Sequence, residues 1–285
     1  LFLAVDEEAN AALERQWDNE PWSRGEMDNF EYRRGYASWK IDFGKVNAFG
    51  TREIGEMDGA IDICNQNFFN NIKALRIKSE KISPNGKHIF SAGANLKERR
   101  DWTRDQILSH LAHQRQVVHR LRTSPFFAIV YVDGIAQGLG VEMCLAADVV
   151  ISSSRSSFAL PEYRLGIIPG AGGYTWAHHL SKHKHEAISW MEQGSIASAE
   201  YAQWLGIVDT VIDVECTGGD EGPEADPSDI YVEEIVSWLA TLSREEQIER
   251  KSARYKDIDF DAWFEEEQTE YARRLSMRKD NDFIV

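Results

Sequence analysis

Strand-like and helix-like segments alternate over the first two-thirds of the chain, and this order constrains the fold more than any other feature. Residues 36–43 alternate apolar and polar side chains as a strand does, and residues 51–68 carry apolar side chains at helical spacing. A helical pattern over 103–121 opens with a capping box, and the apolar run at 126–134 is typical of a buried strand. The alternation favours an α/β layer fold over a sandwich or a helix bundle.

Beyond Ala171 the pattern becomes mostly helical, with longer helices expected at 229–242 and 261–278. An acidic segment containing Gly and Pro, 215–229, precedes them. The predicted organisation is an N-terminal extension (1–30), an α/β core (31–212), and an acidic loop with a C-terminal helical region (213–285).

Charge and cysteine usage narrow the class of protein. The formal net charge is −15 and the pI is about 5.0, so we expect no nucleic-acid partner. Three scattered cysteines form no disulfide framework or zinc spacing, which favours a reducing compartment. We find no apolar run of membrane-spanning length and no signal-peptide pattern at the start, although the first residue is Leu and a removed leader stays an alternative. We therefore expect a cytoplasmic protein, with an organelle matrix as the alternative.

Two glutamates, Glu142 and Glu162, are candidates for catalytic carboxylates. Glu142 lies in an otherwise apolar run, 134–150, and a buried carboxylate is costly unless it is hydrogen-bonded, paired or protonated. Glu162 follows twenty positions later, after Pro161. If both face one cleft, each shifts the pKa of the other, and one can donate a proton while the other accepts one. The alternatives are a carboxylate at a helix N-terminus for Glu142 and a surface loop charge for Glu162.

Small residues and a basic run suggest ligand contacts. Ala92 to Ala94 would let a ligand approach the backbone, and a helix start presents free N–H groups; a simple tight turn is the alternative. The basic run 97–100, with Arg104 nearby, is a candidate for binding phosphate groups, or else a solvated helix face. The histidine-rich stretch 177–186 lacks an obvious acidic ligand, so we prefer a solvated turn to a metal site.

Four segments in order resemble the crotonase (enoyl-CoA hydratase/isomerase) superfamily: FSAGANLKERR at 90–100, GIAQGLGVEMCLAADVV at 134–150, FALPEYRLGIIPGAGG at 158–173 and GSIASAEYAQWLGIVDTV at 194–211. The resemblance covers about residues 46–211. It implies a spiral of ββα units with a C-terminal helical oligomerisation region, assembled as a homotrimer or a dimer of trimers.

The resemblance also implies an activity, the addition of water to, or its removal from, an α,β-unsaturated acyl-CoA thioester. Glu142 and Glu162 match the family's acid/base pair, and the N–H groups of Ala94 and Leu139 match its oxyanion hole. No metal or redox cofactor is implied, since CoA is part of the substrate. The implied substrate- and CoA-binding residues are Ala92, Leu96, Lys97, Gly138 and Gly170.

Leu139 departs from the family, which usually has glycine there. Leucine disfavours a positive φ, so its side chain either narrows the acyl pocket or displaces the loop. This departure, with Tyr163 and Arg164 beside the second glutamate, leaves open an isomerase, a decarboxylase or a C–C bond hydrolase acting on a specialised substrate, including a cyclic one. A non-catalytic scaffold or RNA-binding homologue is a further alternative, against which the glutamate pair and the acidic pI argue.

Overall fold

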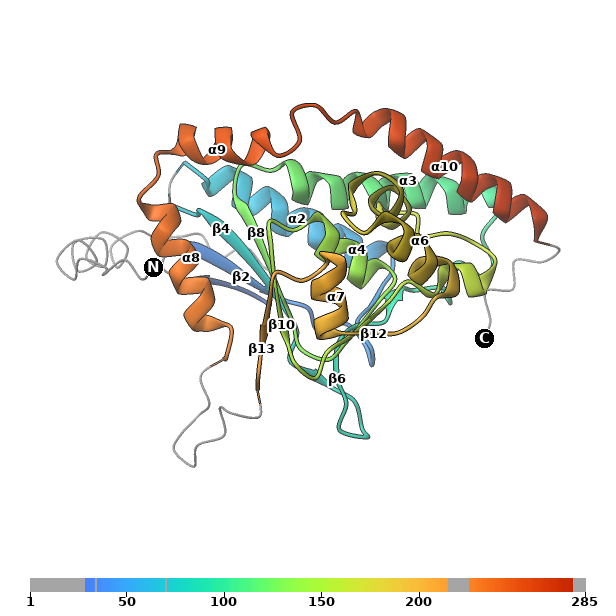
Figure 1. Ribbon diagram of the computed structural model, residues 1–285, viewed down its shortest axis with the longest axis horizontal. Coiled ribbons are helices and arrows are strands. Elements are labelled where there is room, and N and C mark those ends of the chain that lie inside the picture. The colour runs from blue at the N-terminus through green and yellow to red at the C-terminus, as the bar shows by residue number, and fades with distance from the viewer. Residues whose placement is uncertain (1–28, 34, 70, 215–225, 279–285) are drawn as a thin grey trace.

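A six-stranded sheet forms the centre of the computed structural model, which describes residues 29–33, 35–69, 71–214 and 226–278 (Figure 1). The strands, in spatial order, are β1 (Phe30–Arg33), β2 (Tyr36–Lys40), β4 (Ala74–Lys78), β8 (Phe127–Val132), β10 (Val149–Ser153) and β13 (Thr210–Ile212). β1 and β2 pair antiparallel, and every other neighbouring pair is parallel. Parallel pairing requires crossover connections, as the alternation of strands and helices predicted.

Both faces of this sheet are covered, which explains the uninterrupted apolar sequence of β8. Phe127, Ile129 and Tyr131 lie in a cluster with Val232 and Val236 of α8 (Asp229–Ala240). The intervening β8 residues face the larger core on the other side of the sheet, against the helices that follow the strands. A strand buried on both faces reads as a continuous apolar run rather than an alternating one.

Successive ββα units build the core, as expected for the spiral. The first strand of each unit joins the six-stranded sheet, and a second strand runs into a smaller sheet before a helix follows. One smaller sheet has the order β12 (Ala197–Ser198), β11 (Ser157–Ala159), β9 (Ile135–Gln137), β6 (His88–Ser91) and β5 (Lys81–Ile82), and the other pairs β3 (Ala48–Phe49) with β7 (Gly93–Ala94). The unit β8–β9–α4 leads the chain to Glu142, and β10–β11–η1 leads it to Glu162.

The helices agree with the predicted segments, apart from α9 and η1, which were not expected. Within the described residues they are α2 (Thr51–Asn67), α3 (Arg104–Thr123), α4 (Leu139–Ala146), α5 (Gly173–Thr175), α6 (Lys184–Gln193), α7 (Ala199–Leu205), α8, α9 (Arg244–Ala253) and α10 (Phe260–Met277), with a 3-10 helix η1 (Pro161–Leu165) and a π-helix η2 (Trp176–Leu180). Thr103 and Gln106 form the capping box expected at α3. The polar composition of α9 gives little apolar periodicity, so the sequence pattern did not predict this helix.

The last helix returns to the core. Figure 1 shows α10 running along α3 at the outer edge of the helical layer, and Tyr271 and Leu275 pack there against Ile107 and Leu111. No helix in the described ranges combines the length and the apolar character needed to cross a membrane. Residues 1–28, most of the predicted extension, and residues 215–225 of the acidic loop lie outside the described residues.

Candidate active site

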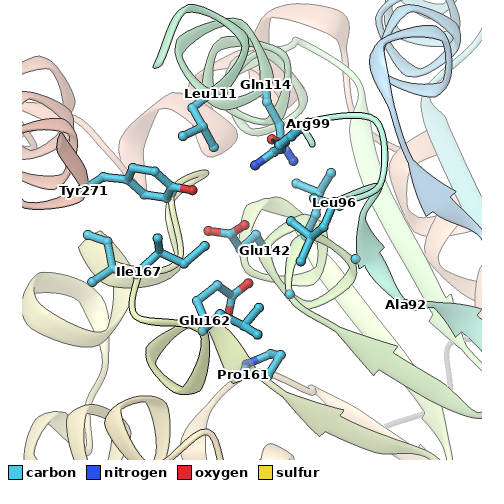
Figure 2. A pocket seen from close by; sticks show the side chains of 17 residues that line it. Ala92, Leu96, Arg99, Leu111, Gln114, Glu142, Pro161, Glu162, Ile167 and Tyr271 are labelled. Atoms are coloured by element: carbon cyan, nitrogen blue, oxygen red, sulfur yellow. Dashed lines mark hydrogen bonds between the residues drawn. The ribbon is translucent and has the colours of Figure 1, made fainter. Parts of the chain in front are cut away.

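A small cavity and a larger groove meet above the start of α4. The cavity has a volume of about 60 Å³ and is lined by the loop 92–99, α3, α4, η1, residues 167–170 and α10 (Figure 2). The groove has a volume of about 670 Å³. Residues that line both are Ala92, Ala94, Leu96, Pro161 and Leu165. A ligand with a small end and a long polar remainder would fit this shape.

Glu142 occupies the first turn of α4 with its side chain buried, at 3% exposure. Its Oε1 accepts hydrogen bonds from the backbone N–H groups of Ala171, at 2.7 Å, and Gly173, at 3.0 Å. Burial raises the pKa of this carboxyl to about 7, and the negative charge of Glu267 acts in the same direction. The two backbone donors lower the pKa and thus limit this rise.

Glu162 reaches the same cavity from η1. Its Oε2 is buried and has no hydrogen-bond partner within the described part of the chain. Burial raises the pKa of the Glu162 carboxyl to about 8, with a further contribution from the charge of Glu142. The structure therefore brings the two carboxyls into one cavity and raises the pKa of both. From the sequence we expected only that each carboxyl would shift the pKa of the other.

Gly138 and Leu139 share the turn that starts α4. Gly138 is the N-cap with φ +50° and ψ −121°, and a Cβ there would lie 2.7 Å from Glu162 Oε1. Leu139 begins the helix without a positive φ, so the strain expected of a leucine at this position does not arise. Leu139 is 1% exposed and is among the residues that line the cavity, and a narrowed acyl pocket stays a prediction.

Every candidate site residue predicted from the sequence lies on the cavity or the groove. The residues on the cavity are Ala92, Ala94, Leu96, Gly138, Leu139, Glu142, Glu162 and Gly170. Lys97 lies on the groove, together with Lys45 and Arg100. Lys45 was not singled out from the sequence, where it stands alone between Gly44 and Val46.

Arg99 corrects the interpretation of the basic run. We expected residues 97–100 to lie together as a phosphate-binding patch, but Arg99 is 2% exposed and lines the cavity. Residues 96–101 form consecutive turns, so neighbouring side chains diverge: Lys97 and Arg100 lie on the groove while Arg99 points inward. The Nη2 of Arg99 donates to Gln114 Oε1 at 2.9 Å.

The sequence analysis also missed residues that α10 brings to the site. Tyr271 lines the cavity, and Glu267 accepts hydrogen bonds from Gly172, Thr175 and the guanidinium of Arg115. Glu267 stands in the apolar stripe of its helix, four positions from Trp263 and from Tyr271. A carboxylate within an apolar stripe is the signal that singled out Glu142, and it was available here too.

The histidine-rich stretch lies away from the cavity. His179 stacks on Trp263 at a centroid distance of 4.5 Å, and its Nε2 lies 3.2 Å from Glu266. Where the chain is described, no three His, Cys, Asp or Glu side chains are grouped so that they could hold a metal ion.

Comparison with known proteins agrees with this architecture. The family model for enoyl-CoA hydratase/isomerase matches residues 41–216, and the chain belongs to this family. A fatty acid oxidation complex subunit alpha of Pseudomonas savastanoi pv. phaseolicola is 32% identical over an alignment of 176 residues that covers 59% of this chain and 22% of that protein. An enoyl-CoA isomerase/hydratase of Zymoseptoria tritici is 31% identical over 169 residues, covering 59% of this chain and 53% of that one. The matched region thus spans from a fifth to about half of these relatives.

Solved structures show the same fold. An enoyl-CoA hydratase from Bacillus halodurans superposes with a TM-score of 0.75 at 17% identity, covering 89% of this chain and 97% of that one. An enoyl-CoA hydratase from Bacillus anthracis gives a TM-score of 0.68 at 23% identity, covering 88% and 91%. The crotonase-like fold expected from the sequence is therefore confirmed, including the C-terminal helices.

Proposed function

We propose that this protein is a hydro-lyase that adds water to, or removes it from, an α,β-unsaturated acyl-CoA thioester. The observation that carries the proposal is the shared enclosure of Glu142 and Glu162, each with a raised pKa. Carboxyls with pKa values near neutrality can exchange protons with substrate at physiological pH. Family membership supplies the coarser class, hydratase or isomerase, and the glutamate pair favours hydration.

In the proposed mechanism, the thioester oxygen accepts hydrogen bonds from the N–H groups of Ala94 and Leu139. Leu139 is the first residue of α4, and the leading N–H groups of a helix have no intrahelical acceptor. As the water oxygen forms a bond to the β-carbon, the α,β double bond shifts electrons toward the thioester oxygen. Donors fixed at that oxygen stabilise the enolate-like charge, and one such donor is typically worth about a hundred- to a thousandfold in rate.

The two glutamates take opposite roles in this scheme. Glu142, whose ionised form is stabilised by the N–H groups of Ala171 and Gly173, accepts the proton of the attacking water. Glu162, whose buried Oε2 has no hydrogen-bond donor among the described residues and whose pKa is raised by burial, holds its proton and delivers it to the α-carbon. The elements of water are thereby added across the double bond, and the Glu142 proton returns to Glu162 through solvent or the product before the next cycle.

The groove is suited to the CoA part of the substrate. Lys45, Lys97 and Arg100 line it and offer positive charge to phosphate groups in a protein whose net charge is negative. No redox or metal cofactor takes part in the proposed reaction. Assembly as a homotrimer or a dimer of trimers stays a prediction from the resemblance.

The test is hydration of crotonyl-CoA and longer trans-2-enoyl-CoAs, followed by loss of the ultraviolet absorbance of the enoyl thioester. We expect Glu142→Gln to lower kcat by about a hundred- to ten-thousandfold, the usual worth of a general base. Glu192→Gln, an exposed carboxylate on α6, is the matched control and should retain wild-type activity. Double-bond migration in a 3-enoyl-CoA at wild-type rate in Glu142→Gln, without hydration by either protein, would instead indicate an isomerase using Glu162 alone.

A further inference from the structure

Arg99 is a buried cation that the proposed reaction does not use. Its guanidinium lines the cavity, and the one side-chain hydrogen bond described for it goes to the neutral amide oxygen of Gln114. No carboxylate of the described residues forms an ion pair with it, whereas buried Arg115 pairs with Glu267 and buried Lys251 with Asp148. Burial has the largest effect on Arg99 and lowers its pKa, although Glu142 and Glu98 favour the charged guanidinium through space. An arginine stays charged when buried, and a buried charge without an ion-pair partner is costly. A ligand that brings negative charge to Arg99 would offset that cost.

Tyr271 supplies a second unused donor. Its side chain is 1% exposed, its hydroxyl oxygen interacts with the guanidinium of Arg99, and its O–H has no acceptor among the described residues. The ring is held in place by packing on Leu111 and Ile167. Figure 2 shows the hydroxyl of Tyr271 and the guanidinium of Arg99 projecting into the same part of the cavity, with Glu142 between them and Glu162.

Together these groups form a recognition site at the cavity wall. One cation and one hydroxyl donor, both buried and both with unused hydrogen-bonding capacity, require an acceptor, and the charge favours an anion over a neutral oxygen. We propose that the acyl group of the substrate is short and carries a carboxylate, which Arg99 and Tyr271 bind. The inference rests on the proposed function for the thioester, and the cavity of about 60 Å³ sets the limit on chain length.

Binding measurements test the carboxylate site without requiring turnover. Glutaryl-CoA and pentanoyl-CoA are saturated thioesters with five-carbon acyl groups that differ in a terminal carboxylate or methyl group. By calorimetry we expect the wild-type protein to bind glutaryl-CoA about ten- to a hundredfold more tightly, the usual worth of a hydrogen-bonded charged group. Equal binding, a preference for pentanoyl-CoA, or binding of neither would overturn the inference.

Two variants assign the preference to the named residues. Arg99→Met should abolish it, and Tyr271→Phe, which removes only the hydroxyl oxygen, should reduce it by about tenfold. Arg250→Met on α9 and Tyr201→Phe on α7 make the same chemical changes at exposed positions and should leave the preference intact. If Arg99→Met does not fold, Tyr271→Phe decides alone. A preference that persists in the folded variants would place the carboxylate elsewhere and contradict the inference.

Turnover separates this inference from the proposed function. The corresponding unsaturated pair is glutaconyl-CoA and pentenoyl-CoA. Hydration of the two thioesters with equal kcat/KM would support the proposed lyase activity and contradict the proposed carboxylate-binding site. Selective binding of glutaryl-CoA, lost in the variants, without hydration of glutaconyl-CoA would support the carboxylate site and overturn the lyase.

Discussion

Glu142 and Glu267 accept hydrogen bonds from neighbouring residues of one short segment, 171–175. Ala171 and Gly173 donate their N–H groups to Glu142, while Gly172 donates to Glu267 at 3.1 Å and Thr175 donates at 3.0 Å. A carboxylate from α4 and one from α10 thus bind the backbone of the same segment. Glu267 of the C-terminal helix therefore positions the proposed base through this segment, and it is not itself a reacting group.

Glu267→Gln should shift the pH dependence of the reaction. Burial is the first cause of the raised pKa of Glu142, and the charge of Glu267 is the second. Removal of that charge lowers the pKa of Glu142 from about 7, so the base is ionised at lower pH and the acidic limb of the kcat profile moves to lower pH. The profile is measured with an enoyl-CoA by stopped-flow absorbance across this range.

Glu265→Gln provides the matched control for that shift. Glu265 is exposed on the same helix, two residues away, so its replacement should leave the acidic limb in place. A lower kcat for Glu267→Gln with an unmoved limb would mean that Glu267 supports the turn only mechanically and contributes no electrostatic effect.

Glu162 should make the protein less stable as the pH rises. The carboxyl titrates near 4.5 when unfolded and near 8 in the folded protein, so between these values the folded state binds more protons than the unfolded state. The free energy of unfolding then falls with pH, by up to about 1.4 kcal/mol per unit, and levels off above the folded pKa. Glu162→Gln lacks this titration, so its stability relative to wild type should increase across the window.

Urea denaturation at several pH values measures that difference. Near the lower end of the window both proteins carry a neutral group at position 162, and their stabilities should be closest there. Glu192→Gln, an exposed carboxylate on α6, should give a pH-independent difference from wild type. A constant difference for Glu162→Gln as well would show that the carboxyl is not held protonated by burial.

The sequence was sufficient to predict the fold and to name the candidate residues of the site. It did not predict which other side chains surround those residues. Periodicity and capping located most helices and strands, because amphipathic faces and buried strands leave local patterns. Arg99 could not be placed inside the cavity from its sequence neighbours, since the direction of a side chain in consecutive turns depends on backbone angles. Tyr271 and Glu267 reach the site through tertiary packing of α10, more than ninety residues beyond Glu162 in the chain, and no local pattern encodes that approach.

Leu139→Ala should widen acyl specificity while preserving the oxyanion donor. The side chain is buried and lines the cavity, and the backbone N–H does not depend on it. We expect kcat/KM for hexenoyl-CoA to rise relative to that for crotonyl-CoA, with a loss of stability of about 2–5 kcal/mol. Leu205→Ala, at a buried position of α7 away from the cavity, should lose comparable stability without a change in the ratio. An unchanged ratio in Leu139→Ala would mean that the acyl group does not reach this side chain.

Gly138→Ala tests whether the turn before α4 must leave room for the Glu162 carboxyl. An alanine Cβ would lie 2.7 Å from Glu162 Oε1, in a backbone conformation that non-glycine residues rarely adopt. The carboxyl must move, and we expect kcat/KM to fall by about a hundredfold or more, the scale of losing a positioned acid. The fall is measured with crotonyl-CoA and normalised to the folded fraction.

Gly206→Ala separates displacement of the carboxyl from backbone strain. Gly206 also has a positive φ, +83°, but a Cβ there meets nothing within 4 Å. This variant should lose about 1–2 kcal/mol of stability, the cost of a left-handed residue, and keep its activity. If Gly138→Ala loses stability but retains wild-type kcat/KM, activity does not require the Glu162 carboxyl in the position that excludes a side chain at residue 138, which would contradict its proposed role as the acid.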